Sequence, residues 1–309
     1  MEIYSTATYT ATEPAVVALG CFDGIHVAHA EVITEARRVA DRLSCRCTVW
    51  TFDEPPKNHF LKEPVPLLTD KEHKNRLISK LGADTLITIP FNKKIASISA
   101  EDFFNNIIVK RLKATHVVCG FDYAFGRNGS GNVDVLKRLC NEHNIGLSVI
   151  PAVEVNGITV SSSVIRELLI SGDADTAATL LGRPYSIRTT VINGQHLARS
   201  LGFPTLNQEF SNGILIPRYG VYASRIQTEN ESGIHYGITN IGVRPTVGGT
   251  IPYAETHIFD FCEDLYGSVV DVELLCFIRP EIKFGSIEEL STQVNKDIKK
   301  AKTVIKDNI

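Results

Sequence analysis

The sequence predicts an α/β domain followed by an all-β domain, and three observations support this. At 309 residues, the chain exceeds the roughly 250–300 residues that one hydrophobic core usually serves. In the first half, short apolar runs alternate with helical patterns, which indicates βαβ units and a parallel sheet. In the second half, short alternating strands are separated by Gly- and Pro-rich turns, as in a sandwich or small barrel. The change falls at LGRPYS (181–186), so the predicted domains are 1–183 and 184–309.

Apolar runs of strand length mark the sheet of the first domain. Runs that are apolar throughout are typical of parallel strands that helices cover on both faces. The predicted strands are AVVALG (15–20), CTVWTF (47–52), DTLITI (84–89), THVVCG (115–120) and LSVIPAV (147–153). Helical patterns lie between them at 30–43, 70–81, 101–112 and 133–142, and short helices follow at 163–171 and 174–181. In such a sheet the ligand is expected at the carboxyl ends of the strands.

Alternation with a period of two residues predicts the strands of the second domain. The strand-like segments are SIRTTVING (186–194), GVYASRIQT (220–228), HYGITNIG (235–242), ETHIFDF (255–261) and VVDVELLCFI (269–278). An amphipathic helix over 286–305 closes the chain, and its SIEEL start is typical of a capped N-terminus. The sequence has no internal repeat, and the two halves differ in type, which argues against duplication.

Composition limits the classes of partner. The net charge is −3, from 32 basic and 35 acidic residues, so neither nucleic acid nor an anionic membrane is an expected partner. A phosphate-bearing ligand must therefore be held by a local site. The polar N-terminus lacks the features of a secretory signal, and no apolar run reaches the roughly 18 residues of a membrane helix. Seven scattered cysteines without a CxxC pair favour a cytoplasmic location.

A Gly- and His-rich segment at residues 20–29 directly follows the first strand and opens the first helix. In an α/β fold, unpaired amide N–H groups and the helix dipole favour phosphate at this place. His26 and His29 share one face of the first turn and can donate hydrogen bonds to a phosphate during transfer. The alternatives are a turn with two satisfied histidines, or a metal pair, although helical metal pairs favour i,i+4 spacing. The setting in a Gly-rich loop favours phosphate.

Two further segments of the first domain carry candidate ligand contacts. In FDYAFGRNGSGN (121–132), the side chains of Phe121, Tyr123 and Phe125 could stack on a planar aromatic ligand, and the alternative is that some of them pack in the core. In SSSVIRELL (161–169), serines at a helix start suit phosphate. Arg166, one turn into that helix, could clamp a departing pyrophosphate; the alternative is a surface arginine.

The second domain has its own polar constellation. Thr205 and Asn207 follow a Gly-Phe-Pro turn on the same side of an extended segment, and their oxygens suit Mg²⁺. Residues 240–246 (NIGVRPT) are expected to form a polar, turn-rich loop. Glu255 lies on an alternating strand with His257 and Phe259 on its face, and its carboxylate could accept a proton from a hydroxyl. The alternatives are a simple β-turn and a solvated strand glutamate.

These segments, in this order, resemble one family. GCFDGIHVAH (20–29) resembles the GxFDGxHxGH signature of HIGH-type nucleotidyltransferases, in the form found in the bacterial bifunctional riboflavin kinase/FMN adenylyltransferase (FAD synthetase) family. TFD (51–53), GFDYAFGR (120–127), VSSSVIR (160–166) and LGRPY (181–185) resemble further elements of its first domain. LGFPTLN (201–207), NIGVRPT (240–246), ETHIFDF (255–261), DLYG (264–267) and the C-terminal helix resemble its riboflavin kinase module.

The resemblance implies a fold, two reactions and a set of site residues. It implies a Rossmann-like nucleotidyltransferase domain and a six-stranded antiparallel riboflavin kinase barrel with a terminal helix. Riboflavin would be phosphorylated by ATP to FMN, and FMN adenylylated to FAD with release of pyrophosphate, both with Mg²⁺. The implied partners are flavins and ATP, bound by a monomer or weak homo-oligomer. The implied catalytic residues are His26, His29, Arg166 and Glu255; phosphate contacts are Gly20, Phe22, Asp23, Gly24, Ser161, Ser162, Ser163, Gly194 and Arg199; flavin contacts are Phe52, Asp122, Tyr123, Phe125 and Arg244; and metal ligands are Thr205 and Asn207.

Four positions depart from the family pattern. Ala28 replaces the glycine of HxGH, Pro55 replaces the histidine of TFDPHP, Val164 replaces the first arginine of ISSTRIR, and Ala198 replaces a glycine of the kinase loop. A methyl group at a glycine position restricts the backbone or crowds a nucleotide. The departures keep two alternatives open: a protein with only one working site, or a flavin-binding regulatory protein without turnover.

Overall fold

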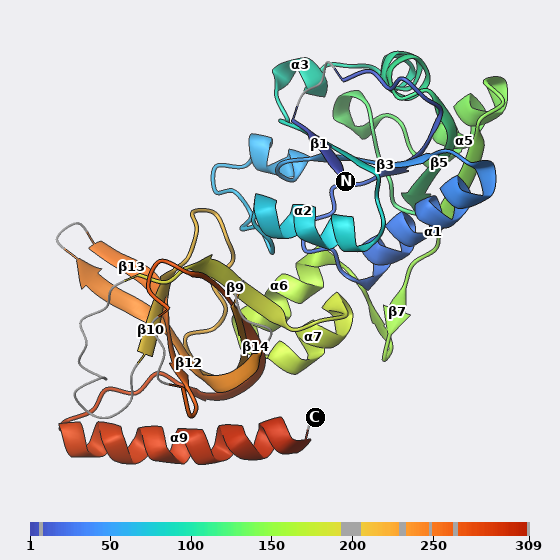
Figure 1. Ribbon diagram of the computed structural model, residues 1–309. Helices are drawn as coiled ribbons and strands as arrows, with labels where there is room; N and C mark the ends of the chain where they lie inside the picture. The colour runs from blue at the N-terminus through green and yellow to red at the C-terminus, as the bar shows by residue number, and fades with distance from the viewer. Residues whose placement is uncertain (6–8, 193–204, 229–232, 247–248, 262–264, 308–309) are drawn as a thin grey trace. The chain divides into compact units, whose positions relative to one another are not determined.

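The computed structural model describes residues 1–5, 9–192, 205–228, 233–246, 249–261 and 265–307 (Figure 1). The chain divides into two compact units, Met1–Ser162 and Ser163–Ile309. Within the described part of the chain, no helix combines the length and apolar character needed to cross a membrane.

The N-terminal unit is built on a six-stranded sheet in which every neighbouring pair is parallel. The strands are β1 (Glu2–Tyr4), β2 (Ala15–Leu19), β3 (Arg46–Phe52), β4 (Thr85–Ile89), β5 (Ala114–Gly120) and β6 (Gly146–Ile150). Their order is β1-β4-β3-β2-β5-β6, so the chain winds one way from β2 and the other way from β5. This reversal places the carboxyl ends of β2 and β5 side by side, which is where α/β sheets bind ligands.

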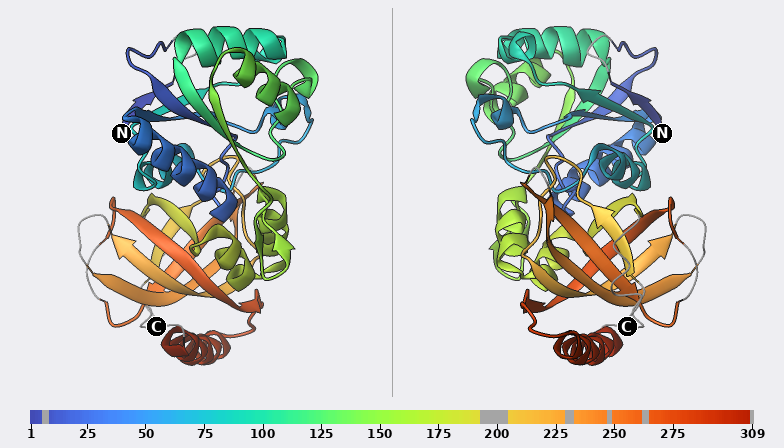
Figure 2. Two further views of the ribbon diagram at one scale, coloured as in Figure 1. Left: turned by 90° about the vertical axis from the view of Figure 1, so that its right-hand side faces the viewer. Right: turned by 90° about the vertical axis from the view of Figure 1, so that its left-hand side faces the viewer.

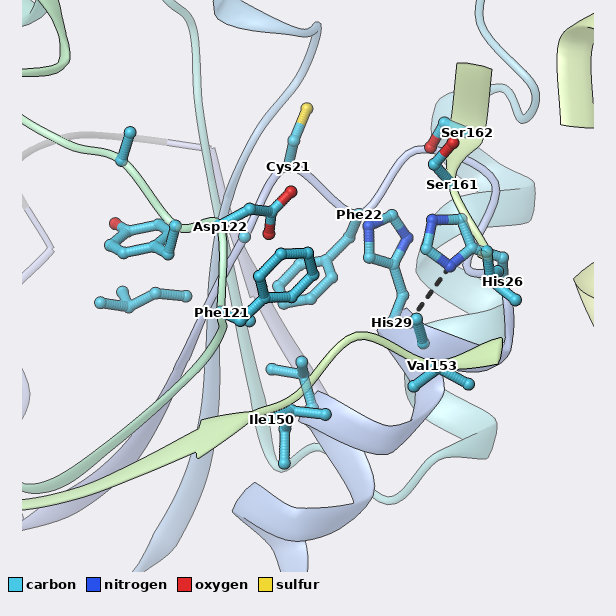
Figure 3. Close-up of a pocket in the computed structure, with 18 of the residues that line it drawn as sticks. Cys21, Phe22, His26, His29, Phe121, Asp122, Ile150, Val153, Ser161 and Ser162 are labelled. Atoms are coloured by element: carbon cyan, nitrogen blue, oxygen red, sulfur yellow. Dashed lines mark hydrogen bonds between the residues drawn. The ribbon is translucent and has the colours of Figure 1, made fainter. Parts of the chain in front are cut away.

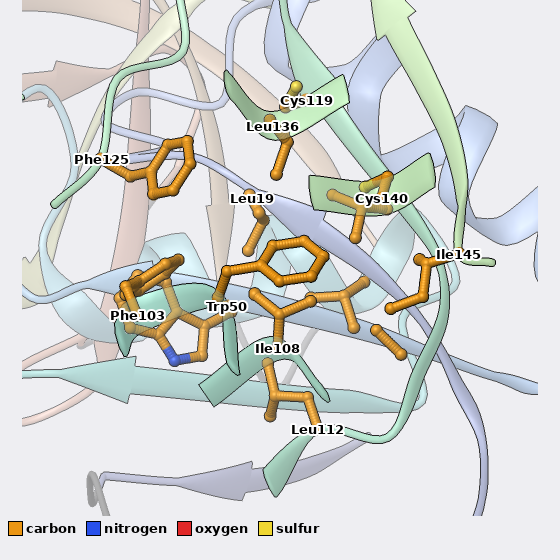
Figure 4. Close-up of a cluster of buried hydrophobic side chains, with 14 of the residues drawn as sticks. Leu19, Trp50, Phe103, Ile108, Leu112, Cys119, Phe125, Leu136, Cys140 and Ile145 are labelled. Carbon is orange, nitrogen blue, oxygen red and sulfur yellow. The ribbon is translucent and has the colours of Figure 1, made fainter. Parts of the chain in front are cut away.

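Helices cover both faces of this sheet, as the uninterrupted apolar strands predict. On one face, α1 (Val27–Leu43) and α2 (Lys71–Lys80) bury Ile33 and Ile78 against Val49. On the other face, the π-helix η2 (Phe103–Arg111) and α5 (Val133–Glu142) pack Phe104 and Leu136 into a second cluster (Figure 4). Two apolar layers therefore hold the sheet rigid, so that the strand ends keep their positions.

Several local features differ from the sequence predictions. The predicted helix 101–112 consists of α4 (Ala100–Asp102) continued by η2, and strand β6 ends before Pro151 because proline removes a ladder donor. Strand β1 was not predicted, because three residues are too short a run to carry a periodic signal. The remaining short elements are η1 (Pro56–Phe60), α3 (Lys93–Ala96), η3 (Arg127–Gly129), β7 (Glu154–Val155) and β8 (Ile158–Thr159).

The C-terminal unit contains a six-stranded antiparallel sheet of order β10-β13-β12-β11-β14-β9. Its elements are α6 (Ser162–Ser171), α7 (Ala174–Leu181), β9 (Tyr185–Thr190), β10 (Thr205–Glu209), β11 (Gly220–Thr228), β12 (Ile234–Thr246), β13 (Gly249–Ile258), β14 (Val269–Pro280) and α9 (Ile287–Asp307). The sheet curls until its edge strands approach each other. Ile192 N–H donates to Asn207 O over 2.8 Å, and the Gln208 side chain donates to Thr189 O over 3.0 Å. These contacts link the two edges of the barrel.

NIGVRPT is not a loop, because its residues pair with β13 from Asn240–Glu255 through Thr246–Gly249, and Pro245 falls near the strand end, where a missing donor costs little. The two compact units of the chain divide after Ser162, whereas the predicted domain boundary lies after residue 183. The cause is that α7 packs against β9 and β14, and that Arg218 N–H donates to Leu169 O in α6 over 2.9 Å.

Helix α9 packs against β11, β12 and β14 (Figure 2) through apolar residues such as Val221, Ile238 and Ala301. A buried ion pair reinforces this contact. Asp297 is 2% exposed, and its carboxylate accepts from Arg279 Nη2 at 2.8 Å and Nε at 2.9 Å. Gln293 Nε2 donates to the same carboxylate over 2.9 Å. The pair therefore fixes the helix on the barrel.

Replacing Asp297 by alanine is expected to destabilise the C-terminal unit by about 3–5 kcal/mol, because it leaves the largely buried Arg279 charge without a carboxylate partner. Urea denaturation followed by far-UV circular dichroism measures this loss. Lys296→Ala, an exposed position on the same helix, is the control and should change stability by less than about 0.5 kcal/mol. A loss of similar size in both variants would contradict the prediction.

Candidate functional sites in the two units

A cavity of about 340 Å³ in the N-terminal unit opens at the strand-order reversal. Gly20, directly after β2, and Gly120, at the end of β5, lie on its wall, as expected for the carboxyl ends of these strands. Figure 3 shows the two histidines on one side, the aromatic ring of Phe121 below Asp122, and the two serines above. The predicted site residues that line the cavity are Gly20, Phe22, His26, His29, Phe52, Asp122, Tyr123, Ser161 and Ser162.

The turn between β2 and α1 has an unusual backbone. Phe22 (φ 52°), Gly24 (φ 83°) and Ile25 (φ 41°) all have φ values in the left-handed region, which is rare for an aromatic and exceptional for a β-branched residue. The Gly20 α-carbon also approaches the Phe22 ring so closely that a Cβ there would lie 2.8 Å from it. Such strain is typical of functional sites, and left-handed turns of this kind can aim amide N–H groups at an anion.

His26 and His29 form a stacked pair at the start of α1. Their ring centroids are 3.6 Å apart with an interplanar angle of 16°. His26 is the N-cap, and its Nδ1 accepts from the His29 N–H over 3.3 Å, so its proton is on Nε2 when the ring is neutral (dashed line in Figure 3). His29 Nδ1 is buried without a hydrogen-bond partner among the described residues. Because an orphaned polar atom is costly, this nitrogen favours a polar ligand in the cavity.

The protonation of His29 follows from its surroundings. Burial, the neighbouring His26 and the Lys74 ammonium group together hold the pKa of His29 well below the usual 6.5. The ring is therefore neutral at pH 7 in the free protein. A neutral imidazole can donate one hydrogen bond to a phosphate oxygen, and a bound anion would favour its protonation.

Three residues that were predicted to contact ligand in the first domain, Asp23, Gly24 and Phe125, do not line this cavity. The Asp23 carboxylate accepts from Leu68 N–H over 2.9 Å, and Gly24 N–H donates to Thr69 Oγ1 over 3.3 Å. Neither residue belongs to the cavity lining, so in this structure they fasten the turn to residues 68 and 69. Phe125 is 6% exposed and packs in the hydrophobic core. For this residue the core role therefore holds, and not the predicted contact with a planar ligand.

The serine segment spans the division between the two units. Ser161 and Ser162 line the cavity, and Ser162 Oγ donates to Asp23 O over 2.9 Å, which ties this segment to the histidine turn. Ser163 is exposed on α6. Arg166 is 6% exposed in the same helix, so the alternative of an ordinary surface arginine does not hold.

A second cavity, of about 230 Å³, lies in the C-terminal unit between the barrel surface and α9. Glu255 and His257 on β13, Thr205 on β10 and Asn240 on β12 form its barrel side. Thr205 Oγ1 donates to Glu255 Oε1 over 2.7 Å. This contact brings together two residues that are 50 positions apart in the sequence.

The other predicted residues of this site lie around that pair. Asn207 pairs with Glu255 across the β10–β13 ladder and is 3% exposed. Arg244 pairs with Ile251 in β12. Gly194 and Arg199 lie outside the described residues. The alternation along β13 predicted His257 beside Glu255, whereas Asn240 reaches the site only because β12 pairs with β13.

Family comparisons match each unit separately. A family model described as FAD synthetase matches residues 8–164, and one described as riboflavin kinase matches residues 181–305.

The chain belongs to the bifunctional riboflavin kinase/FMN adenylyltransferase family.

Members of this family resemble the chain over nearly its whole length. The bifunctional riboflavin kinase/FMN adenylyltransferase of Bacillus subtilis is 36% identical over 93% of this chain and 91% of its own length. The protein of the same name from Escherichia coli K12 is 30% identical over 92% of this chain and 91% of its own. Among solved structures, a Streptococcus pneumoniae chain titled macrolide-efflux protein has a TM-score of 0.86 and 29% identity, covering 96% of both chains. The shared fold, rather than that title, is what this likeness supports.

The structure explains one departure from the family pattern, at Ala28, and gives no explanation for Val164. Ala28 lies in the first turn of α1 and has no left-handed φ, so the backbone does not require glycine and the expected restriction is absent. Its methyl group lines the cavity. Pro55 precedes the 3₁₀ helix η1, whose Asn58 side chain exchanges two 3.0 Å hydrogen bonds with the Val65 backbone. Ala198 lies outside the described residues.

The low pKa of His29 makes stability depend on pH. Below about pH 6.5 the unfolded chain binds a proton at this ring that the folded chain does not. Stability contributed by the neutral ring is therefore present above pH 6.5 and lost as pH falls toward the folded-state pKa, with a slope of at most about 1.4 kcal/mol per pH unit.

Trp50 allows this prediction to be tested, because it is the single tryptophan and is buried in the N-terminal unit. Urea unfolding followed by its fluorescence, between about pH 5 and pH 8, should show a shallower acid decline in His29→Phe than in the unmodified chain. His116, whose pKa burial also lowers, supplies a background that both proteins share. Equal slopes would contradict the assignment.

Proposed function

We propose that the C-terminal unit phosphorylates riboflavin with ATP, and that the N-terminal unit transfers an adenylyl group from ATP to the FMN produced. One observation carries the proposal: each unit that matches one of the two enzyme families has its own cavity, with a polar pair at its wall. These pairs are His26 with His29, and Thr205 with Glu255. Because both pairs are intact, a protein with one degenerate site is not favoured.

For adenylyl transfer, the FMN phosphate attacks the α-phosphate of ATP in line, and pyrophosphate leaves. The reaction needs no covalent intermediate on the protein, so positioning and charge stabilisation supply the rate. The donors that we assign to the phosphates are the Phe22 amide group, the His26 Nε2–H and the His29 ring, all of which belong to residues at the cavity wall. We assign Phe121 and Tyr123, which line the same cavity, to the flavin ring, since a planar aromatic ligand packs well on aromatic faces. For Arg166 we propose contact with the departing pyrophosphate.

For the kinase reaction, the 5′-hydroxyl of riboflavin attacks the γ-phosphorus of ATP, the bond to the bridging oxygen breaks, and ADP leaves. We assign Glu255 as the general base that accepts the hydroxyl proton. The hydrogen bond from Thr205 holds one carboxylate oxygen in place, so the carboxylate is oriented before substrate binds. Phe284 and Leu290 supply the apolar side of this cavity, which suits the flavin ring.

Mg²⁺ fits the donors of the kinase site. Thr205, Asn207 and Glu255 carry oxygen atoms on adjacent positions of β10 and β13, and oxygen is the ligand that Mg²⁺ prefers. Among the described residues, no group of three His, Cys, Asp or Glu side chains is arranged to hold a metal, so most ligands would come from water and ATP phosphates. When bound, the ion neutralises phosphate charge.

We place the chain in a reducing, cytoplasmic environment, which the free state of the six described cysteines supports. Its ligands are flavins and ATP, with no nucleic acid or membrane partner. We propose a monomer or weak homo-oligomer.

Separation of flavins after incubation tests the function directly. Purified protein with riboflavin, ATP and Mg²⁺ should yield FMN and then FAD by chromatography, and FMN given alone with ATP should yield FAD. Absence of both products would disprove the enzyme proposal. FMN without FAD, or FAD only from added FMN, would leave a protein with one activity.

A further inference from the structure

Lys74 in α2 is a buried lysine that no sequence motif had marked. It is 7% exposed, and its Nζ donates to Cys21 O over 2.7 Å, to Phe52 O over 2.8 Å and to Thr51 Oγ1 over 3.1 Å. Three donors meeting three oxygen atoms use the full capacity of an ammonium group. Because carbonyl oxygens can only accept, the arrangement suits the charged form.

The three acceptors belong to two strand ends. Cys21 is the second residue after the end of β2. Thr51 and Phe52 are the last two residues of β3. Thr51 Oγ1 also donates to Cys21 O over 2.8 Å, so the hydroxyl and the ammonium group share that carbonyl. Cys21 and Phe52 both line the cavity of the N-terminal unit. The Lys74 ammonium group therefore lies directly behind the cavity wall.

Among the described residues, no carboxylate forms an ion pair with this ammonium group. Its hydrogen bonds within the described part of the chain go to two carbonyl oxygens and one hydroxyl. Burial lowers the pKa of Lys74, and the nearby side chains of Cys21, Asp23 and Asp53 only partly offset this. A buried ammonium group is strongly unfavourable unless it is paired. Its charge also reaches the cavity, since it contributes to the low pKa of His29.

We propose that Lys74 supplies a fixed positive charge to the adenylyl-transfer site, and that the phosphates of the substrate supply the counter-charge for this ammonium group. It acts as a positioning residue, because it holds the ends of β2 and β3 together and does not itself line the cavity. The identity of the phosphate ligand rests on the proposed function, whereas the anion site itself does not.

Pyrophosphate binding, observed at His29, tests this inference in the full-length chain. The nuclear magnetic resonance signals of the His29 ring, assigned by their absence in His29→Gln, report on this cavity separately from the kinase site. Pyrophosphate is titrated with and without Mg²⁺ into the unmodified chain, Lys74→Met, Lys74→Gln and Lys80→Met. Lys74→Gln keeps side-chain donors but loses the charge. Lys80→Met is the matched control, since Lys80 is exposed on the same helix. Trp50 fluorescence checks folding.

We expect both Lys74 variants to bind pyrophosphate at least tenfold more weakly, a change of about 1.4 kcal/mol, with Lys80→Met unchanged. The pKa of His29 in the free protein should rise in both, because a neighbouring positive charge is removed. Unchanged affinity in both variants would overturn the proposal. Unchanged affinity in Lys74→Gln alone would overturn the role of the charge and leave only the hydrogen bonds.

Two further outcomes are distinguishable. If Lys74→Met does not fold, the decision rests on Lys74→Gln and on the unmodified chain, where pyrophosphate should shift the ¹⁵N signal of Lys74 Nζ; no shift would count against the proposal. If the unmodified chain forms no FAD, yet its pyrophosphate affinity depends on Lys74, the proposed function fails and the anion site stands.

Discussion

Glu255→Gln is expected to lower the rate of FMN formation by about 10²–10⁴-fold, because the amide cannot accept the hydroxyl proton. The change is nearly isosteric, and Thr205 Oγ1, which donates to the carboxylate over 2.7 Å, can donate equally to an amide oxygen. The barrel should therefore keep its stability. FAD formation from added FMN should stay within about twofold of the unmodified chain, because His26 and His29 belong to a separate cavity.

The measurement is the initial rate of FMN production from riboflavin and of FAD production from FMN, each at saturating ATP. Glu209→Gln serves as the control, since Glu209 is an exposed carboxylate at the end of the neighbouring strand β10. A base that acts during the chemical step should affect kcat more than KM. Retention of more than about a tenth of the kinase rate would rule out Glu255 as the general base.

His29→Ala is expected to have the opposite selectivity, with FAD formation from FMN reduced by about 10²–10³-fold and FMN formation retained. A hydrogen-bond donor aimed at developing phosphate charge has an effect of this size. His29 stacks on His26 and meets the Phe22 ring edge-on at 5.3 Å, so its loss also leaves a gap. His29→Asn fills part of that gap and keeps a donor, and it should recover part of the rate.

Thermal unfolding followed by Trp50 fluorescence separates a catalytic loss from a folding defect. His143→Ala is the matched control, because this exposed histidine ends α5 in the same unit. If His29→Ala forms FAD at the unmodified rate, His29 does not act on the phosphates. If both histidine variants lose activity together with stability, the effect is structural. Selective loss in both Glu255→Gln and His29→Ala would remove the alternative of a flavin-binding protein without turnover.

Local patterns were sufficient for most elements of the fold. Strands β2 and β4 and helices α5 and α7 have bounds close to those that apolar runs and helical periodicity predict, because burial on a sheet face or helix stripe leaves a repeating signal. The position of the histidine turn was also predictable, since the Gly-rich segment follows an apolar run and precedes a helical pattern. Patterns failed where the signal was short, as in β1, or where pairing overrode turn-like composition, as in NIGVRPT.

By itself, therefore, the sequence determined two domains of different type, the place of the Gly- and His-rich turn after a buried strand, and the presence of a carboxylate on an alternating strand. Only the tertiary structure decided which strand ends meet, that Thr205 contacts Glu255, that Phe125 packs in the core, and that Lys74 is buried behind the cavity. The reason is physical: periodicity reports which face of an element is buried, whereas these contacts depend on strand order and register between residues that are distant in the chain.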